Sequence, residues 1–362
     1  MKKSLIALAV AGIVAAPAAF ADTTIYGQAN LSFDAINNGA KTNSASANNV
    51  SSNVSRLGFK GSEDLGDGLS AVYQIEQAIA MDTAALGGST VRDTFAGLSS
   101  GTMGTLIAGT HDTPYKMATR GLDLFGDSVA DNRSIMGLAG THDARLGNVV
   151  AYIAPTMSGV TLAVATAAGA EIPVVNSTKA SVWSLAALYG AGPINANFGY
   201  QTITYGSAGT GDWAGVANDK LTAWKVGGSY TMDALQLNAI YEKTSSSIAG
   251  GINSGDTHAR TAFYLAGKYN VNANDAVKAA YTSAGKKANV TDTEATQFSV
   301  GYDHNLSKHT SVYALYSKIS NKGTGAAGQA NYTFSQATSA ANANGGISSS
   351  PSVVSLGMKH SF

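Results

Sequence analysis

The chain has 362 residues, with 23 Lys and Arg against 23 Asp and Glu, 41 Gly and no Cys, and only 13% of its residues are charged. No internal run of about 18 apolar residues is present, which excludes a polytopic helical membrane protein, and the lack of cysteine excludes a disulfide-stapled domain or a zinc–cysteine site. The balanced charge argues against a basic nucleic-acid-binding surface, so no nucleic-acid partner is expected.

The start of the chain has the pattern of a cleaved export signal. Two lysines are followed by an apolar stretch over 5–16, and residues 19–21 (Ala-Phe-Ala) fit a small-residue cleavage site. A membrane anchor is the alternative, but the stretch is short and a proline interrupts it. We therefore expect a signal peptide over 1–21 and an exported mature unit over 22–362.

Beyond this signal, apolar and polar residues alternate with a period of two, which is typical of amphipathic strands. In the first such segment Ile25, Leu31 and Phe33 share one face, while Gln28 and Asn30 lie on the other. The alternation recurs over residues 222–230, 235–242, 263–269 and 297–302. Strands, rather than helices, are predicted along the whole mature chain.

Short turns and long connections alternate between these strands. Seven short turns are predicted at residues 64–68, 99–104, 155–159, 190–193, 231–234, 270–275 and 304–308. Longer stretches rich in Gly, Ser, Asn, Asp and Thr are predicted as loops over 35–53, 79–90, 112–144, 168–178, 205–219, 244–260, 284–293 and 320–350. Seven hairpins, a first strand near 23–34 and a last strand near 352–362 give sixteen strands.

So many strands need cover for their apolar faces, and no segment has a helical period long enough to supply it. Closing the sheet into a transmembrane β-barrel removes every unpaired edge, and the apolar outer face then contacts lipid. Tyr189, Tyr230, Tyr269 and Tyr302 each precede a short turn, as expected of an aromatic belt at a membrane interface. The alternative is a soluble sandwich whose core these tyrosines fill. We expect an all-β fold, a sixteen-stranded antiparallel transmembrane barrel.

Several ordered segments resemble strands of the Gram-negative outer-membrane general diffusion porins, and are closest to the neisserial and betaproteobacterial type. They are Ser55-Arg56-Leu57-Gly58-Phe59-Lys60-Gly61 with its continuation through Glu76, Arg92-Asp93-Thr94-Phe95-Ala96-Gly97-Leu98, residues 144–152, and the terminal strand 356–362. The resemblance implies a homotrimer of barrels among outer-membrane lipids, with the third long loop folded into each lumen. It also implies a water-filled pore for passive diffusion of small hydrophilic solutes and ions.

Porins of this kind carry arginines on the barrel wall that face acidic residues of the third loop across a constriction. The resemblance places Arg56, Arg92 and Arg145 in this basic wall. The alternation agrees, because each of the three is opposite in phase to apolar neighbours on its strand and therefore points inward. The alternative is that they are scattered, solvated arginines.

The acidic side of the constriction is expected within residues 112–144, where the Pro-Glu-Phe-Gly-Gly-Asp element of enteric porins is absent. A loop of this length in a compact protein is usually functional or disordered. We expect Asp123 and Asp127 to supply the acidic side, with Glu76, inward on the third strand, as a further candidate. The alternative for each is a solvated or turn-forming carboxylate.

Three other patterns in the chain do not support an enzyme, a cofactor or a metal site. Residues 97–101 match G-x-S-x-G, but another strand follows where a nucleophile elbow needs a helix. Residues 323–328 match G-x-G-x-x-G, again without a following helix to bind a phosphate. The six histidines include no pair at close metal-ligand spacing on one element.

Two rival functions stay open, a substrate-specific porin and an adhesin that uses the barrel as an anchor and residues 320–350 as its surface epitope. The preference for anions or cations is also open. Phe362 ends an alternating strand and resembles the terminal aromatic signal that the outer-membrane insertion machinery reads. A simple lipid-facing anchor is the alternative for Phe362.

Overall fold

The computed structural model of the protein describes residues 22–39, 44–83, 85–137, 142–168, 181–207, 214–215, 220–246, 259–287, 292–323, 332–334 and 350–362. Its strands are β1 (Asp22–Asn37), β2 (Ser46–Ser52), β3 (Arg56–Gly66), β4 (Leu69–Ala80), β5 (Ala85–Val91), β6 (Thr94–Ser100), β7 (Gly104–Asp112), β8 (Arg145–Ile153), β9 (Val160–Ala168), β10 (Ser181–Ala191), β11 (Ile194–Thr204), β12 (Gly206–Ser207), β13 (Ala214–Gly215), β14 (Lys220–Met232), β15 (Leu235–Ser246), β16 (Arg260–Asn270), β17 (Asp275–Ala284), β18 (Ala295–Asn305), β19 (Thr310–Asn321) and β20 (Ser352–Ser361). Its helices are α2 (Pro114–Arg120) and the 3₁₀ helix η1 (Asn132–Ser134). The predicted signal and most of the stretch 320–350 lie outside the described residues. Within the described part of the chain, no helix is both long and apolar enough to cross a membrane.

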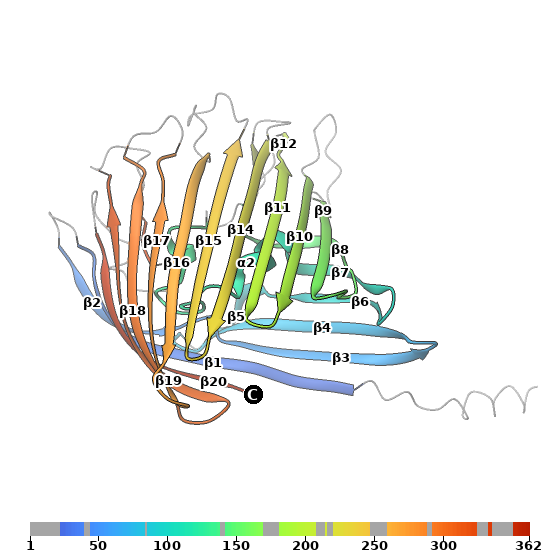
Figure 1. Cartoon of the computed structure of the whole chain (residues 1–362), viewed down its shortest axis with the longest axis horizontal. Coiled ribbons are helices and arrows are strands. Elements are labelled where there is room, and N and C mark those ends of the chain that lie inside the picture. The colour runs from blue at the N-terminus through green and yellow to red at the C-terminus, as the bar shows by residue number, and fades with distance from the viewer. Residues whose placement is uncertain are drawn as a thin grey trace, which may run out of the picture.

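Among the described residues, sixteen strands pair in one closed antiparallel sheet, which confirms the predicted barrel (Figure 1). The strand β1 closes the ring because it pairs with β3 along its first half and with β20 along its second half. The strands β2, β5, β12 and β13 lie in the connections between wall strands.

The seven predicted short turns all join neighbouring wall strands. They connect β3 to β4, β6 to β7, β8 to β9, β10 to β11, β14 to β15, β16 to β17 and β18 to β19. In the first of them Gly66, Asp67 and Gly68 have φ values of 89°, 51° and 73°. Two glycines flank one aspartate in this left-handed run because only glycine enters that region without a steric cost.

The long connections hold more regular structure than the sequence predicted. Residues 35–53 contain β2, which pairs with the second half of β1, and 79–90 contain most of β5, which pairs with β4. Residues 112–144 contain α2 and η1. The prediction of loop throughout these stretches is therefore wrong, because a free strand edge offers backbone hydrogen bonds to a polar segment of low strand propensity.

Side-chain exposure follows the predicted alternation. On the outer face Leu237 and Leu265 are 49% and 53% exposed, whereas Asn238 and Tyr264, one residue along each strand, point inward and are buried. The four tyrosines of the predicted aromatic belt are all exposed at strand ends. A polar, tightly filled interior and an apolar exterior suit a protein whose outer solvent is lipid.

The seam between the first and last strands has a specific contact. Gly27 N donates to the carbonyl of Phe362 at 3.0 Å, and Phe362 N donates to the carbonyl of Gly27 at 3.1 Å. A Cβ at Gly27 would lie only 2.5 Å from Cζ of the Phe362 ring. The terminal ring therefore lies directly over the backbone of the first strand, where only glycine leaves room.

Candidate functional site

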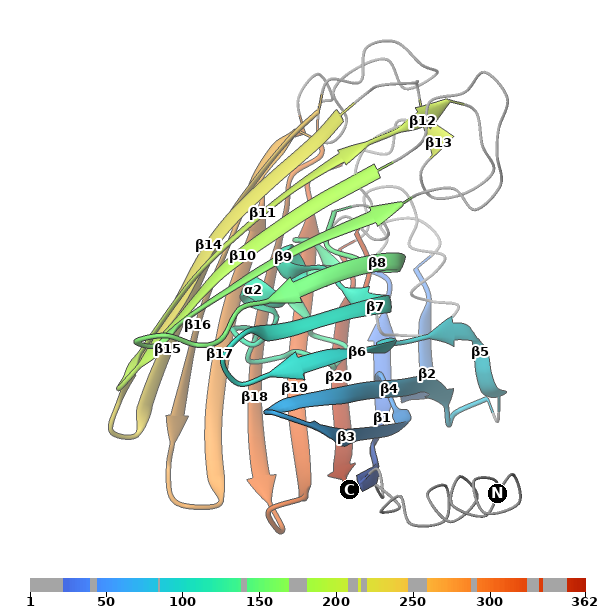
Figure 2. The same ribbon diagram turned by 90° about the vertical axis from the view of Figure 1, so that its right-hand side faces the viewer.

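Residues 113–144, named loop 3 from here on, follow β7 and turn into the barrel. The hydroxyl of Thr113 accepts a hydrogen bond from the backbone N–H of Lys116 at 3.3 Å, and Pro114 occupies the first helical position. This is a favourable helix start, so the loop opens with α2. The helix contacts the inner faces of β9, β10, β11 and β14 (Figure 2).

After α2, loop 3 follows the wall and is fastened to it by side chains of several strands. The hydrogen bonds run from Asn238 Nδ2 to the carbonyl of Leu122 (2.7 Å), from Leu124 N to the Tyr264 hydroxyl (2.9 Å), from Gln297 Nε2 to the carbonyl of Ala130 (3.0 Å) and from Asn30 Nδ2 to the carbonyl of Asp127 (2.6 Å). An apolar cluster that includes Phe125, Val129 and Ile135 fills the space between this part of the loop and the wall. Loop 3 is therefore a packed layer inside the barrel.

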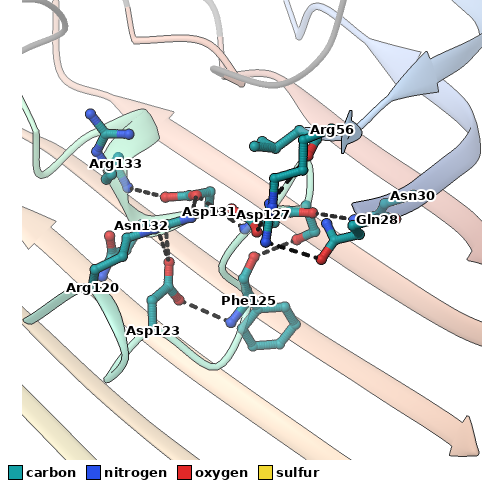
Figure 3. A network of polar contacts seen from close by, with 12 residues as sticks. Gln28, Asn30, Arg56, Arg120, Asp123, Phe125, Asp127, Asp131, Asn132 and Arg133 are labelled. Carbon is teal, nitrogen blue, oxygen red and sulfur yellow. Dashed lines mark hydrogen bonds and ion pairs between the residues drawn. The ribbon is translucent and has the colours of Figure 1, made fainter. Parts of the chain in front are cut away.

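Asp127 joins the tip of loop 3 to the wall, as Figure 3 shows. Its Oδ2 lies 3.2 Å from Nη1 of Arg56 on β3, and its Oδ1 lies 2.7 Å from Nη2 of Arg120. Arg120 also binds Asp131 at 2.7 Å. Burial opposes ionisation of the Asp127 carboxyl, but the guanidinium groups of Arg120 and Arg56 outweigh it and lower the pKa to about 2. Asp127 is thus charged at neutral pH and faces the predicted basic wall.

The structure places Asp123 differently from Asp127. Its buried carboxylate accepts hydrogen bonds from two backbone N–H groups of loop 3 and from the Tyr264 hydroxyl, at 2.9–3.0 Å. Arg120 is 3.8 Å away. Burial, together with the charge of Asp131, raises the pKa of Asp123 to about 6. Asp123 therefore holds the loop in shape and is not brought against the wall arginines.

Glu76 on β4 lies among the wall arginines rather than on the opposite side. Its carboxylate forms a close ion pair with Arg92 and is 3.8 Å from Arg56. It also accepts a hydrogen bond from the Tyr26 hydroxyl at 2.9 Å. Glu76 thus partly neutralises two of the three predicted basic residues.

Arg145 at the start of β8 is paired in the same way. Its Nε is 2.7 Å from Asp93, and its Nη2 is 3.0 Å from Asp112. Lys116 of α2 binds the same oxygen of Asp112 at 2.9 Å. The structure thus brings Arg145 against loop 3 through Asp112 and Lys116, while Arg56 reaches the loop through Asp127.

The two ends of loop 3 meet in a buried polar network on β14 and β15. Glu242 accepts a hydrogen bond from the Tyr115 hydroxyl at 2.8 Å and lies 3.2 Å from His142 Nε2. Lys225 lies 3.1 Å from Asp143 and 4.1 Å from the centre of the Tyr115 ring. Burial opposes the charge of Asp143, but Lys225 and then Arg133 hold its pKa well below the usual range.

Sequence reasoning missed several members of this constellation. Arg120, Lys116, Asp93 and Asp112 were not expected at the constriction, nor was Glu242 at the root of loop 3. The spacings Asp112 to Lys116 and Arg120 to Asp123 are those of ion pairs along a helix, and in the structure each pair joins α2 to the chain just before or just after it. The cross-barrel pairs carry no such local signal.

Comparison with known proteins decides the family. The family described as Gram-negative porin matches residues 5–324 of the chain. The chain belongs to this family. This porin is 27% identical over 378 residues to the outer membrane porin protein 32 of Delftia acidovorans, with 100% of each chain covered.

Solved structures agree on the fold of the porin. An anion-selective porin from Comamonas acidovorans matches with a TM-score of 0.75 at 22% identity, covering 94% of this chain and 100% of the other. A trimer form of OmpT from Vibrio cholerae matches with a TM-score of 0.66 at 17% identity, covering 94% and 99%. The protein is an outer-membrane channel for passive diffusion of small hydrophilic solutes, as predicted.

Proposed function

We propose that loop 3 and the facing wall strands β3, β4, β6, β7 and β8 bound the narrowest part of the pore. The observation that carries the proposal is the ion pair of Arg56 with Asp127, at 3.2 Å, where the basic wall meets the loop inside the barrel. Arg92 and Arg145 extend the basic side. Opposed charges at a narrow point orient water and penalise apolar solutes, so hydrophilic solutes pass preferentially.

We further propose that the pore has a weak preference for anions. Every wall arginine is paired with carboxylates, which limits the net charge at the constriction itself. Towards the short turns, however, the lumen carries Lys268, Lys278 and Lys359, and of these Lys278 is paired with Asp303 at 2.9 Å. The likeness in fold to an anion-selective porin supports the same direction.

The reversal potential of single porin trimers in a salt gradient tests both proposals. Changing Arg56→Gln and Arg92→Gln together leaves Glu76 and Asp127 with fewer cationic partners, so the potential should shift towards cation selectivity. The shift should be larger at about 0.1 M salt than at about 1 M, where the Debye length falls from about 10 Å to about 3 Å. Lys243→Gln on the outer face is the matched control for loss of a positive charge. Normal trimers with an unchanged potential would refute the constriction assignment.

The assembly proposals follow the family. We propose a homotrimer that forms after removal of residues 1–21, that catalyses no reaction, and whose Phe362 is read by the insertion machinery. The trimer form recorded for Vibrio cholerae OmpT supports the oligomeric state. The Phe362 ring lies at the end of the closing strand, faces outward and is 55% exposed in the folded barrel.

A further inference from the structure

Two glycines on the inner face of the barrel lie directly beneath loop 3. A Cβ built on Gly199 of β11 would be 3.0 Å from the Cβ of Ala118 and 3.1 Å from the carbonyl oxygen of Tyr115. A Cβ built on Gly227 of β14 would be 2.6 Å from Cδ1 of Leu122. Ordinary contacts begin at 3.4 Å, so a side chain at Gly199 requires the helix α2 to give by a few tenths of an ångström, and one at Gly227 requires the end of the Leu122 side chain to shift.

A third glycine lies beneath the tip of the loop, on β18. A Cβ on Gly301 would be 3.0 Å from Cε1 of the buried Phe125 ring and 3.1 Å from Cε of Lys278. The three glycines therefore lie under successive parts of loop 3, at the helix, just after it and at the tip.

The backbone does not explain these glycines. Positive φ values occur at other glycines of the described chain but not at Gly199, Gly227 or Gly301. All three are in regular strands, where glycine weakens the strand because it packs no side chain and loses more entropy. Close approach of another part of the chain is the remaining reason for glycine at such positions.

We propose that Gly199, Gly227 and Gly301 set the width of the pore by fixing how closely loop 3 approaches the wall. The inference rests on the proposed function, in which loop 3 bounds the opening. The wall is a closed, hydrogen-bonded sheet, whereas side-chain contacts hold the loop, so an added methyl group displaces the loop. An alanine at position 227 needs about 0.8 Å of movement at Leu122 Cδ1 and about 0.4 Å at Thr119 Cγ2, which would lie 2.6 Å and 3.0 Å from the new methyl group. That movement is directed away from the wall and into the opening, so larger side chains give narrower pores.

Single-channel conductance and sugar-driven swelling of porin vesicles test this inference. The series Gly227→Ala and Gly227→Val should lose conductance in order of side-chain size, and swelling should fall most for the largest sugar. Gly199→Ala should act in the same direction. Gly267→Ala is the matched control, because this lipid-facing glycine has its nearest neighbour, Leu237 Cδ2, at 3.4 Å. It should leave both readouts unchanged.

A second-site change separates loop displacement from general damage to the barrel. Leu122→Ala removes the atom that lies 2.6 Å from the new methyl group, so the double variant with Gly227→Ala should recover conductance. Wild-type conductance and sugar cutoff in both Gly199→Ala and Gly227→Val would overturn the inference. If Gly227→Val forms no trimers, Gly199→Ala and Gly227→Ala decide the question, and wild-type conductance and sugar cutoff in both would overturn the inference.

The charge variants separate failure of this inference from failure of the proposed function. If the Arg56→Gln, Arg92→Gln variant shifts the reversal potential while the glycine variants change nothing, only the glycine inference fails. If neither set changes the pore, loop 3 is not the constriction and both proposals fail.

Discussion

Replacing Glu242 should loosen loop 3 at its root. The side chain is 2% exposed and serves both ends of the loop, through Tyr115 at one end and His142 at the other. Glu242→Ala leaves the Tyr115 hydroxyl and the His142 ring facing each other across a buried gap. Removing one partner of a buried charged pair costs about 3–5 kcal/mol. Each 1.4 kcal/mol changes an equilibrium tenfold, so the population of locally opened loop should rise by about two to three and a half orders of magnitude.

The milder Glu242→Gln keeps an oxygen that can accept from Tyr115 and removes only the charge. A hydrogen bond to a charged group contributes about 1.5–3 kcal/mol and a neutral one about 1 kcal/mol, so this variant should raise the opened population by only about one order of magnitude. Glu294→Ala is the matched control, because Glu294 pairs at 3.3 Å with a largely exposed Lys322. Exposed pairs add little to stability.

Hydrogen exchange of loop 3 amides, read by mass spectrometry on folded trimers, measures these populations. Protection of the amides of residues 114–135 should be highest in Glu294→Ala, lower in Glu242→Gln and lowest in Glu242→Ala. The strands β17 and β18 should keep their protection in all three variants. Open-channel current noise should rise in the same order. Loop protection in Glu242→Ala equal to that of the Glu294→Ala control would refute the reasoning, because the network would then not hold the loop.

Three further outcomes are expected. Leu265→Arg on the lipid face should cost about 2–4 kcal/mol in folding into vesicles, whereas Lys268→Arg in the lumen should leave the folding free energy close to that of the native chain. Deleting Phe362 should lower the amount of heat-modifiable trimer in the outer membrane, and Phe362→Tyr should restore it; normal trimer levels after the deletion would contradict the signal role. The folded-state pKa of Asp123 is raised to about 6, so the protonated carboxyl is the form that the folded loop favours. Its contribution to loop stability is therefore complete below about pH 3.8 and is lost as the pH rises through 6. Loop 3 exchange, corrected for intrinsic rates, should therefore be slower at pH 5 than at pH 7.5, and Asp123→Asn should abolish the difference.

The barrel could be predicted from the sequence because apolar and polar residues alternate along each wall strand, which distinguishes its outer face from its inner face. Leu265 and Tyr264 are neighbours in the chain, but Leu265 faces outward and Tyr264 faces the interior of the barrel. An alternation with a period of two predicts this difference. The short strands β2 and β5 show no such alternation in their sequences. They form because β1 and β4 offer free edges, which is a property of the sheet rather than of residues 46–52 or 85–91.

The constriction could be read only in part. The resemblance to porins and the inward position in the strand alternation both predicted Arg56 at the constriction, and in the structure Arg56 forms an ion pair with Asp127. Asp123 could not be told from Asp127, because both lie in one turn-rich segment and no periodicity fixes the direction of a side chain in a loop. Contacts from distant strands decide it, namely Tyr264 for Asp123 and Asn30 for Asp127. Pairs such as Lys225 with Asp143 join positions 82 residues apart, so only the assembled barrel specifies them.

The seam between β1 and β20 limits how the protein can be made. Gly27 lies in the first described strand and Phe362 directly follows the last, and the two exchange two backbone hydrogen bonds. A nascent chain that lacks its last strand leaves the edge of β1 unpaired, and lipid cannot satisfy those backbone groups. Contacts between such distant positions are slow to form, because the entropy of closing the largest possible loop must be lost first. The ring therefore leaves backbone groups unsatisfied in the bilayer until β20 pairs with β1, and we expect insertion to wait until β20 has been made.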